Sequence, residues 1–197
     1  MIHDLRAEYM GRYLRPLRRD DIEDLRIWRN ESSLNRYLRA TGQISPRMQE
    51  AWYEGMLADP DQVFFAIGHG EHPMVGALSL YDFAENSCQI GRIIIGEASE
   101  RGKGLGRLSF LMAMAAGIRY FDRERFRLFV HPDNKPARAM YQRIGFSDTG
   151  ITRPFDDGGV EYEMEIDRQN LYVRNEEMKQ IVVTNNPTEQ NREQDHA

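Results

Sequence analysis

The sequence is poor in the residues on which covalent cross-links and metal sites depend. Its 197 residues include a single cysteine, Cys88, so an internal disulfide is impossible and a cysteine-based zinc site is excluded. His69 and His72 lie in a turn-like segment. We interpret them as exposed turn residues rather than metal ligands, and we expect no metal site.

Long apolar runs and an excess of positive charge are also missing. No run approaches the ~18 apolar residues that a membrane span requires, and the first residues, MIHDLRAEYMGR, contain no apolar segment of the kind found in signal peptides. The formal net charge of −5 argues against a general nucleic-acid-binding surface. We therefore expect neither a membrane nor a nucleic-acid partner, and a cytoplasmic location.

Composition favours one globular domain followed by a polar end. Hydrophobic residues make up 41% of the chain and charged residues 29%, a balance typical of soluble globular proteins. We assign residues 1–168 to this domain. From residue 169 on, the sequence becomes polar and ends in NNPTEQNREQDHA, so we expect 169–197 to be a partly disordered extension.

Strand and helix patterns alternate along the domain. Period-two alternation and turn residues predict strands at 13–17, 63–67, 74–81, 88–95, 125–130 and 160–166. Capping residues and helical spacing predict helices at about 21–30, 31–39, 46–57, 105–119 and 134–144.

The most informative stretch runs from Gln89 to Gly106, QIGRIIIGEASERGKGLG. It predicts a strand, a polar turn and a glycine-rich loop that opens onto a helix. Glycines at 102, 104 and 106 allow the backbone to approach a ligand and to turn its N–H groups towards an anion. Because the start of the helix adds the positive end of its dipole, a pyrophosphate group suits this position.

Two common phosphate-binding motifs do not match this loop. A P-loop requires a Gly-Lys-Ser/Thr triplet, and none follows Gly102 at the required spacing. A dinucleotide fingerprint that begins Gly102-x-Gly104 requires a third glycine three residues further on, where this chain has Arg107 and then Leu108. Such a motif would also follow the first strand rather than lie in the middle of the chain.

Two blocks of sequence resemble the GNAT superfamily of N-acetyltransferases. Arg101, Gly104 and Gly106 match its Arg/Gln-x-x-Gly-x-Gly/Ala acetyl-CoA loop. Downstream, HPDNKPARAMYQRIGF resembles the family segment Asn-x-x-Ala-x-x-x-Tyr-x-x-x-Gly-Phe, with matches at Asn134, Ala137, Tyr141, Gly145 and Phe146. With the flanking pattern, the resemblance covers residues ~12 to ~168 and identifies the chain as a member of this family.

The resemblance implies an α+β fold and acetyl-CoA as co-substrate. The expected architecture is a central, mostly antiparallel twisted sheet of six to seven strands, flanked by helices, in which one splayed strand pair binds acetyl-CoA. The residues implied in acetyl-CoA binding are Ile93, Ile94, Ile95, Arg101, Gly102, Lys103, Gly104, Leu105, Gly106, Asn134 and Ala137.

Amine acetylation by a thioester requires a neutral amine, an oxyanion stabiliser and an acid for the departing thiolate. By resemblance, a backbone N–H of the segment 92–95 polarises the thioester carbonyl and Tyr141 is the general acid. Many relatives carry a glutamate as base where this chain has Gln89, which cannot take a proton. Glu97, Glu85, Asp82 and His131 remain as alternative bases.

The expected acceptor contacts are Trp28, Arg29, Asn30 and Arg92, with Tyr37 and Trp52 as further candidates. The Trp-Arg-Asn triplet resembles a feature of relatives that acetylate amino sugars attached to nucleotides. An amino-sugar amine also needs less help from a base than a lysine-like amine. We therefore favour a small amine acceptor, in particular an amino sugar or sugar nucleotide.

Other interpretations stay open from sequence alone. A protein N-terminal amine, as in ribosomal-protein acetylation, or a polyamine could be the acceptor. A non-catalytic acyl-CoA-binding regulatory module is an alternative of another class, because Gln89 replaces the usual base. An edge strand of the sheet could also pair two chains into a homodimer.

Overall fold

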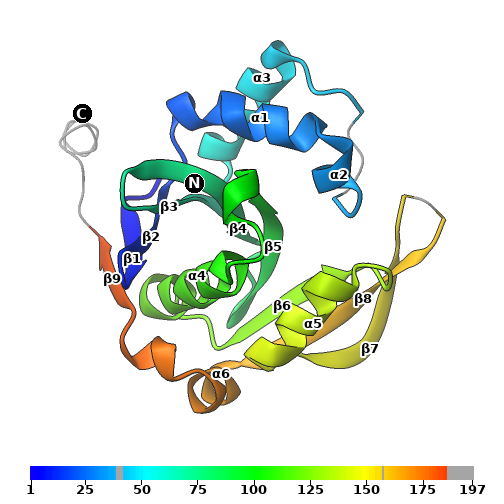
Figure 1. The fold of residues 1–197 in the computed structure, drawn as a ribbon. Helices are drawn as coiled ribbons and strands as arrows, with labels where there is room; N and C mark the ends of the chain where they lie inside the picture. The colour runs from blue at the N-terminus through cyan, green and yellow to red at the C-terminus, as the bar shows by residue number, and fades with distance from the viewer. Residues whose placement is uncertain (39–41, 157, 186–197) are drawn as a thin grey trace.

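The computed structural model describes residues 1–38, 42–156 and 158–185. Within them one sheet of nine strands runs in the order β7-β8-β6-β5-β4-β3-β2-β1-β9 (Figure 1). The strands are β1 (Leu5–Tyr9), β2 (Arg12–Pro16), β3 (Gln62–His69), β4 (His72–Tyr81), β5 (Ser87–Ile95), β6 (Arg125–Val130), β7 (Ser147–Pro154), β8 (Val160–Asp167) and β9 (Val182–Asn185). Neighbouring strands are antiparallel, except that β5 and β6 are parallel.

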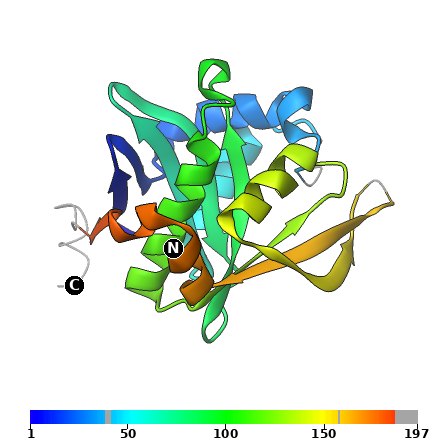
Figure 2. The same ribbon diagram turned by 60° about the horizontal axis from the view of Figure 1, so that its bottom comes forward.

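Helices cover both faces of the sheet. Figure 2 shows α4 and α5 in front of the sheet and the N-terminal helices behind it. The α-helices are α1 (Ile22–Asn30), α2 (Ser32–Asn35), α3 (Pro46–Ala58), α4 (Leu105–Phe121), α5 (Lys135–Ile144) and α6 (Arg168–Arg174), and the 3-10 turns are η1 (Arg19–Asp21), η2 (Ala98–Glu100) and η3 (Glu176–Lys179).

Helix α4 is the central helix of the larger core. Its residues from Ser109 to Gly117 are all buried, and a helix that is apolar on all sides must be enclosed. It packs with Phe65, Leu80 and Phe126 of the strands. We call this side the first face of the sheet.

The second face carries a smaller core under α1 and α3. Phe64, Ala66 and Ala77 of the strands pack there with Leu25 of α1 and Met56 of α3. Residues that pair across neighbouring strands point to the same side of a sheet. Tyr81 pairs with Gln89, and Gln89 pairs with Arg127, so all three lie on this second face.

The parallel strands β5 and β6 separate soon after they meet. Ser87, Cys88 and Gln89 pair with Arg125, Phe126 and Arg127, and the pairing between the two strands ends there. Residues 90–95 of β5 therefore run on beside β4 alone. This is the splayed strand pair that the sequence predicts, and it leaves backbone groups of β5 available to a ligand.

The predicted α+β fold class is confirmed, with two to three strands more than the expected six to seven. The described strands that no predicted range covers are β1, β7 and β9, and β1 and β9 pair with each other at one edge of the sheet. β1 and β9, with five and four residues, are too short for period-two alternation to stand out. The expected helix 31–39 is present as the shorter α2, and residues 39–41 lie outside the described residues.

Part of the predicted polar extension is folded. Residues 168–185 fold onto the domain as α6, η3 and β9, and Leu171 and Met178 are buried in the larger core. Asn175, with no exposed surface, donates hydrogen bonds to the carbonyls of Ile144 and Leu171 at 2.9 Å. Although residues 168–185 are polar on average, these few apolar and amide side chains fix the segment to the domain. Residues 186–197 lie outside the described part of the chain.

Candidate active site

The glycine-rich loop has the geometry that the sequence predicts. Gly102 and Gly104 have φ angles of +77° and +79°, a region that favours glycine. A Cβ atom at either position would meet nothing within 4 Å, so the backbone here is accessible. Gly104 precedes α4 and no side chain caps the helix start, which leaves N–H groups of the first turn for an anion.

Side chains around the loop fix its position. Arg101 donates to the carbonyl oxygens of Ile95 at 3.0 Å and Gly96 at 2.6 Å, so its guanidinium ties the loop to the end of β5. Lys103 is exposed and forms an ion pair with Glu100 at 3.1 Å. Lys103 therefore remains at the surface of the loop, where it can reach a phosphate.

The predicted turn residue His69 lies in a more structured environment than expected. It is the last residue of β3, and its Nε2 atom lies 3.2 Å from a carboxylate oxygen of Glu100. The sequence offered no signal for this contact, because Glu100 belongs to the distant η2 turn.

A β-bulge shapes the free part of β5. Ser79 pairs with Gly91 and Ala77 with Ile94, so Arg92 and Ile93 are opposite a single residue of β4. Arg92 has a φ angle of +51°, which turns the local backbone out of the regular ladder.

The three isoleucines of β5 divide between the two cores. Ile94 is buried in the smaller core, whereas Ile93 and Ile95 pack against the larger one. The side chains are therefore used for packing, and what the segment offers a ligand is backbone. Gly106 of α4 approaches this strand closely, since its Cβ position would lie 3.7 Å from Ile93 Cδ1.

Tyr141 lies in α5, on the first face of the sheet. Its ring packs against Phe110 and Phe146, with centroids 5.1 Å and 6.0 Å apart, and the residue is 6% exposed. Burial raises the pKa of the phenol well above its usual value, and the nearby Tyr81 and Glu161 raise it further. Tyr141 thus holds its proton throughout the neutral range.

The start of α5 is fixed by Asn134. The Asn134 side chain accepts a hydrogen bond from the Ala137 N–H at 3.3 Å, which is an N-cap interaction. Asn134, which the family resemblance implies in acetyl-CoA binding, therefore also caps the start of this helix.

Tyr81 and Glu161 are polar groups near Tyr141 that the sequence analysis missed. The Tyr81 hydroxyl lies 3.3 Å from the Cβ position of Gly91, beside the point where β5 leaves β6. Burial raises the pKa of Tyr81. Glu161 is 4% exposed and accepts a hydrogen bond from Arg153 Nε at 2.7 Å. The alternation in β8 indicated which residues share a face with Glu161, but not that this face is buried.

Gln89 and the alternative bases occupy different positions. Gln89 Nε2 donates to Asp82 Oδ2 at 2.6 Å, so one of the four candidates contacts Gln89 directly. His131 is buried and accepts from the Asp133 N–H at 3.2 Å. Glu85 and Glu97 are exposed.

The expected acceptor residues of α1 separate into two groups. Asn30 exchanges two hydrogen bonds with the Ile44 backbone, at 2.9 Å and 2.8 Å, and Trp28 lies on the backbone of Gly96. Both are therefore engaged in the fold. Trp52 meets Phe64 edge-on at 5.1 Å, which agrees with a packing role.

Arg29 and Arg92 bring two positive charges together on the second face. The Arg92 guanidinium lies 3.9 Å from the Tyr81 ring centroid and donates to Gln62 Oε1 at 2.6 Å. Burial lowers the pKa of Arg29, and the charge of Arg92 lowers it further. The half-buried guanidinium of Arg29 beside the exposed one of Arg92 favours an anion at this position.

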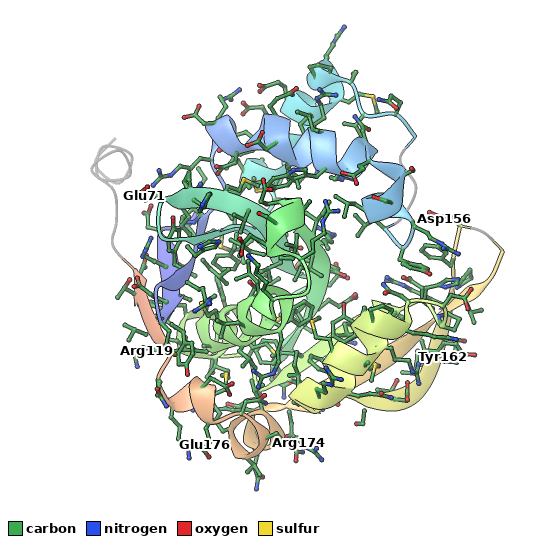
Figure 3. All side chains as sticks on the ribbon, viewed as in Figure 1. Glu71, Arg119, Asp156, Tyr162, Arg174 and Glu176 are labelled. Carbon is green, nitrogen blue, oxygen red and sulfur yellow. The ribbon has the colours of Figure 1, made fainter. Side chains whose placement is uncertain are left out.

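A ring cluster links three loops near the end of β6. Tyr37, after α2, stacks on His131 at 5.6 Å and donates to the Asp133 carbonyl at 3.1 Å. His131 in turn contacts Phe155 at 5.1 Å. In Figure 3 the labelled Asp156, which follows Phe155, marks this end of the β7–β8 arm, on the side nearest α2. The cluster therefore joins the N-terminal helices to the far half of the sheet.

The described residues contain no helix with the length and apolar character needed to cross a lipid bilayer.

Comparison with known proteins agrees with this geometry. Residues 12–147 match the family model described as the acetyltransferase (GNAT) domain. A curated relative, the N-acetyltransferase 9-like protein of Nematostella vectensis, is 25% identical over 128 residues, which cover 59% of this chain and 63% of the relative. The match thus spans a little under two thirds of that relative's length.

Solved structures share the fold at lower identity. Spermidine N-acetyltransferase from Vibrio cholerae, in complex with CoA and spermine, has a TM-score of 0.76 and 20% identity, covering 83% of this chain and 99% of its own. RimJ from Mycobacterium smegmatis, in complex with CoA-disulfide, has a TM-score of 0.72 and 21% identity, covering 81% and 83%. On the match of the domain model to most of its length, the chain belongs to the GNAT acetyltransferase family.

Proposed function

We propose that this protein is an acetyl-CoA-dependent N-acetyltransferase that acetylates a primary amine of a small acceptor by direct attack in a ternary complex. The observation that carries the proposal is the position of Tyr141. Its phenol is buried, has a raised pKa, and lies within electrostatic range of Tyr81, whose hydroxyl adjoins the splayed part of β5. A proton donor is thus available where a thiolate would leave.

The residues around the splay fit acetyl-CoA. The start of α4, with Gly102 and Gly104, would hold the pyrophosphate through backbone N–H groups, and Lys103 would add a positive charge. The free backbone of residues 93–95 would hold the pantetheine arm. Two related structures contain CoA or CoA-disulfide. When bound, acetyl-CoA supplies an activated acetyl thioester.

Different protein groups would stabilise the oxyanion and protonate the leaving group. A backbone N–H of the bulged segment 92–95 binds the carbonyl oxygen as it becomes negative, and one such donor contributes about 3 kcal/mol. The raised pKa of Tyr141 keeps its proton in place until the sulfur accepts it as the C–S bond breaks, and the proton that the attacking nitrogen loses passes to water. Because both substrates bind together, no covalent enzyme intermediate is required.

The charges on the second face favour an amine that also carries an anionic group. Arg29 and Arg92 lie close enough for the charge of Arg92 to lower the pKa of Arg29. A phosphate or carboxylate of the acceptor would relieve this repulsion. An amino sugar attached to a nucleotide has both the weakly basic amine and the phosphates, so we favour this class.

A polycationic acceptor is the second candidate, because Glu161 and Glu163 are buried on β8. The spermidine N-acetyltransferase relative acts on such amines. However, Glu161 already pairs with Arg153 at 2.7 Å, and Glu163 accepts a hydrogen bond from Thr149 at 2.9 Å. The Arg153 guanidinium offsets the charge of Glu161, which reduces the negative charge that a polyamine would meet. A protein N-terminal amine is the third candidate.

The test is release of free CoA from acetyl-CoA with three acceptors: a nucleotide-linked amino sugar, spermidine and a peptide with a free N-terminus. We expect turnover of the amino sugar, and a KM for it that rises about 10- to 100-fold in Arg29→Met and Arg92→Met, while the KM for acetyl-CoA stays unchanged. Faster turnover of spermidine, improved by these substitutions, would identify a polyamine enzyme. Binding of acetyl-CoA with no turnover would identify a non-catalytic module.

A further inference from the structure

The Gln89 side chain has a fixed orientation. Asp82 Oδ2 lies 2.6 Å from Gln89 Nε2, and a carboxylate only accepts hydrogen bonds, so the amide nitrogen must face Asp82. The amide oxygen Oε1 consequently points to the other side. It is buried, and no described residue donates a hydrogen bond to it. Gln89 as a whole is 8% exposed.

Gln89 stands at the point where β5 and β6 separate. It is the last residue of β5 that pairs with β6, opposite Arg127, and its partner on β4 is Tyr81. The Tyr81 hydroxyl adjoins Gly91, two residues further along β5. The unpartnered amide oxygen therefore lies on the second face, beside the phenol that marks the entrance to the splay.

Two more buried polar atoms on this face lack hydrogen-bond partners among the described residues. They are Ser79 Oγ on β4 and Arg127 Nε on β6. Ser79 pairs with Gly91, and Arg127 with Gln89, so the three atoms belong to adjacent strands. Buried polar groups are nearly always hydrogen-bonded in folded proteins. Their concentration here favours a position that a polar molecule can occupy.

We propose that Gln89 Oε1 accepts a hydrogen bond from an N–H of the acceptor amine, and that Asp82 is the positioning residue that holds the amide in this orientation. This inference rests on the proposed function and names a residue that selects its substrate. The Asp82 charge polarises the Gln89 amide through their short hydrogen bond and strengthens its oxygen as an acceptor. An amine, which always carries N–H donors, suits such an oxygen.

An amide at residue 89, in place of the carboxylate of many relatives, affects how kcat/KM depends on pH. Gln89 does not titrate, and the raised pKa of Tyr141 keeps its phenol protonated well into the alkaline range. We therefore expect kcat/KM to rise with pH as the acceptor amine loses its proton, with no ionisation contributed by residue 89.

The experiment compares wild type, Gln89→Leu and Asp82→Ala with Gln49→Leu as the matched control. Gln49→Leu also removes a buried side-chain amide that lacks hydrogen-bond partners among the described residues, but it lies in α3 and not at the splay. The probe is whichever of the amino-sugar nucleotide, spermidine and peptide the wild type acetylates fastest. We expect the acceptor KM to rise at least tenfold in Gln89→Leu and by a smaller factor in Asp82→Ala, with the acetyl-CoA dissociation constant unchanged in both. Gln49→Leu should leave both constants near wild type.

Two further measurements make the test specific. Adding Asp82→Ala to Gln89→Leu should raise the acceptor KM no further, because Asp82 acts through the amide. Gln89→Glu should add a second ionisation to the pH profile. An unchanged acceptor KM in Gln89→Leu, with normal wild-type turnover, would mean that Oε1 is merely hydrated and would overturn the inference alone. A wild type that acetylates none of the three amines would remove the proposed function and the inference together.

Discussion

The indole ring of Trp28 lies directly on the backbone of Gly96. A Cβ atom at Gly96 would lie 1.8 Å from Trp28 Cδ2, so only glycine fits under the ring. Gly96 follows β5, and its carbonyl also accepts a hydrogen bond from Arg101 at 2.6 Å. One glycine thus connects helix α1, the end of the splayed strand and the glycine-rich loop.

Gly96→Ala should therefore disturb both packing and ligand binding. We expect a loss of about 1–3 kcal/mol in the free energy of unfolding, as for other overpacked sites, together with weaker CoA binding. Denaturant unfolding and calorimetry with CoA measure the two effects. Gly55→Ala is the control, because its Cβ would meet nothing within 4 Å. If the two variants behave alike, the contact between Trp28 and Gly96 is unimportant.

Asn30 and Arg29 are neighbours with different expected roles. Asn30→Ala removes two hydrogen bonds to the Ile44 backbone and should lower stability by about 1–3 kcal/mol, while the acceptor KM of the folded protein stays unchanged. Arg29→Met should raise the acceptor KM and leave the free energy of unfolding nearly unchanged. Thermal unfolding and steady-state kinetics on both variants separate the roles. If the acceptor KM rises in Asn30→Ala but not in Arg29→Met, Asn30 and not Arg29 contacts the acceptor.

Asn175 fastens the segment that follows β8. It is fully buried, donates to two carbonyls, and accepts from Arg107 at 2.7 Å. Asn175→Ala removes these three hydrogen bonds, although Arg107 keeps its ion pair with Glu177, and should cost about 2–3 kcal/mol in the free energy of unfolding. Asn170→Ala, at an exposed position, should cost less. Equal losses in urea unfolding would show that the segment adds little stability.

Because His3 is buried in its neutral form, we expect the free energy of unfolding to fall in mild acid. Burial lowers its pKa from 6.5 to about 4, and its Nε2 lies 3.0 Å from the Phe64 carbonyl. Because the unfolded chain takes up the proton more readily, the contribution is present above pH 6.5 and is lost as pH falls towards 4. Each pKa unit corresponds to about 1.4 kcal/mol.

The check for His3 is the free energy of unfolding of wild type and His3→Gln between pH 4 and 8. The wild type should lose more stability than the variant over the acid part of this range. Parallel curves would show that His3 titrates alike in the folded and unfolded chain.

Local patterns were sufficient for the elements around the cofactor loop. Period-two alternation located β6 and β8, and Asn134 and Gly145 marked both ends of α5. The splay followed from family resemblance and agrees with the short pairing of β5 with β6. Here each residue acts through its own neighbours in the chain, so a short window of sequence contains the information.

Long-range packing decided what the sequence could not show. Glu161 alternates with Tyr162 as in any half-exposed strand, yet it is buried and pairs with Arg153 of β7. Trp28 and Asn30 looked like binding residues and are engaged by Gly96 and Ile44. The orientation of the Gln89 amide, which leaves its oxygen without a partner among the described residues, follows from its contact with Asp82.

The proton donor is the central claim, and Tyr141→Phe tests it most directly. Phenylalanine keeps the ring contacts with Phe110 and Phe146 and removes only the hydroxyl. The measurement is the single-turnover rate of acetyl transfer with saturating acetyl-CoA, alongside the dissociation constant of CoA. We predict a rate about 10²- to 10⁴-fold below wild type with unchanged CoA binding. A rate within twofold of wild type would contradict the assignment of Tyr141 as the acid.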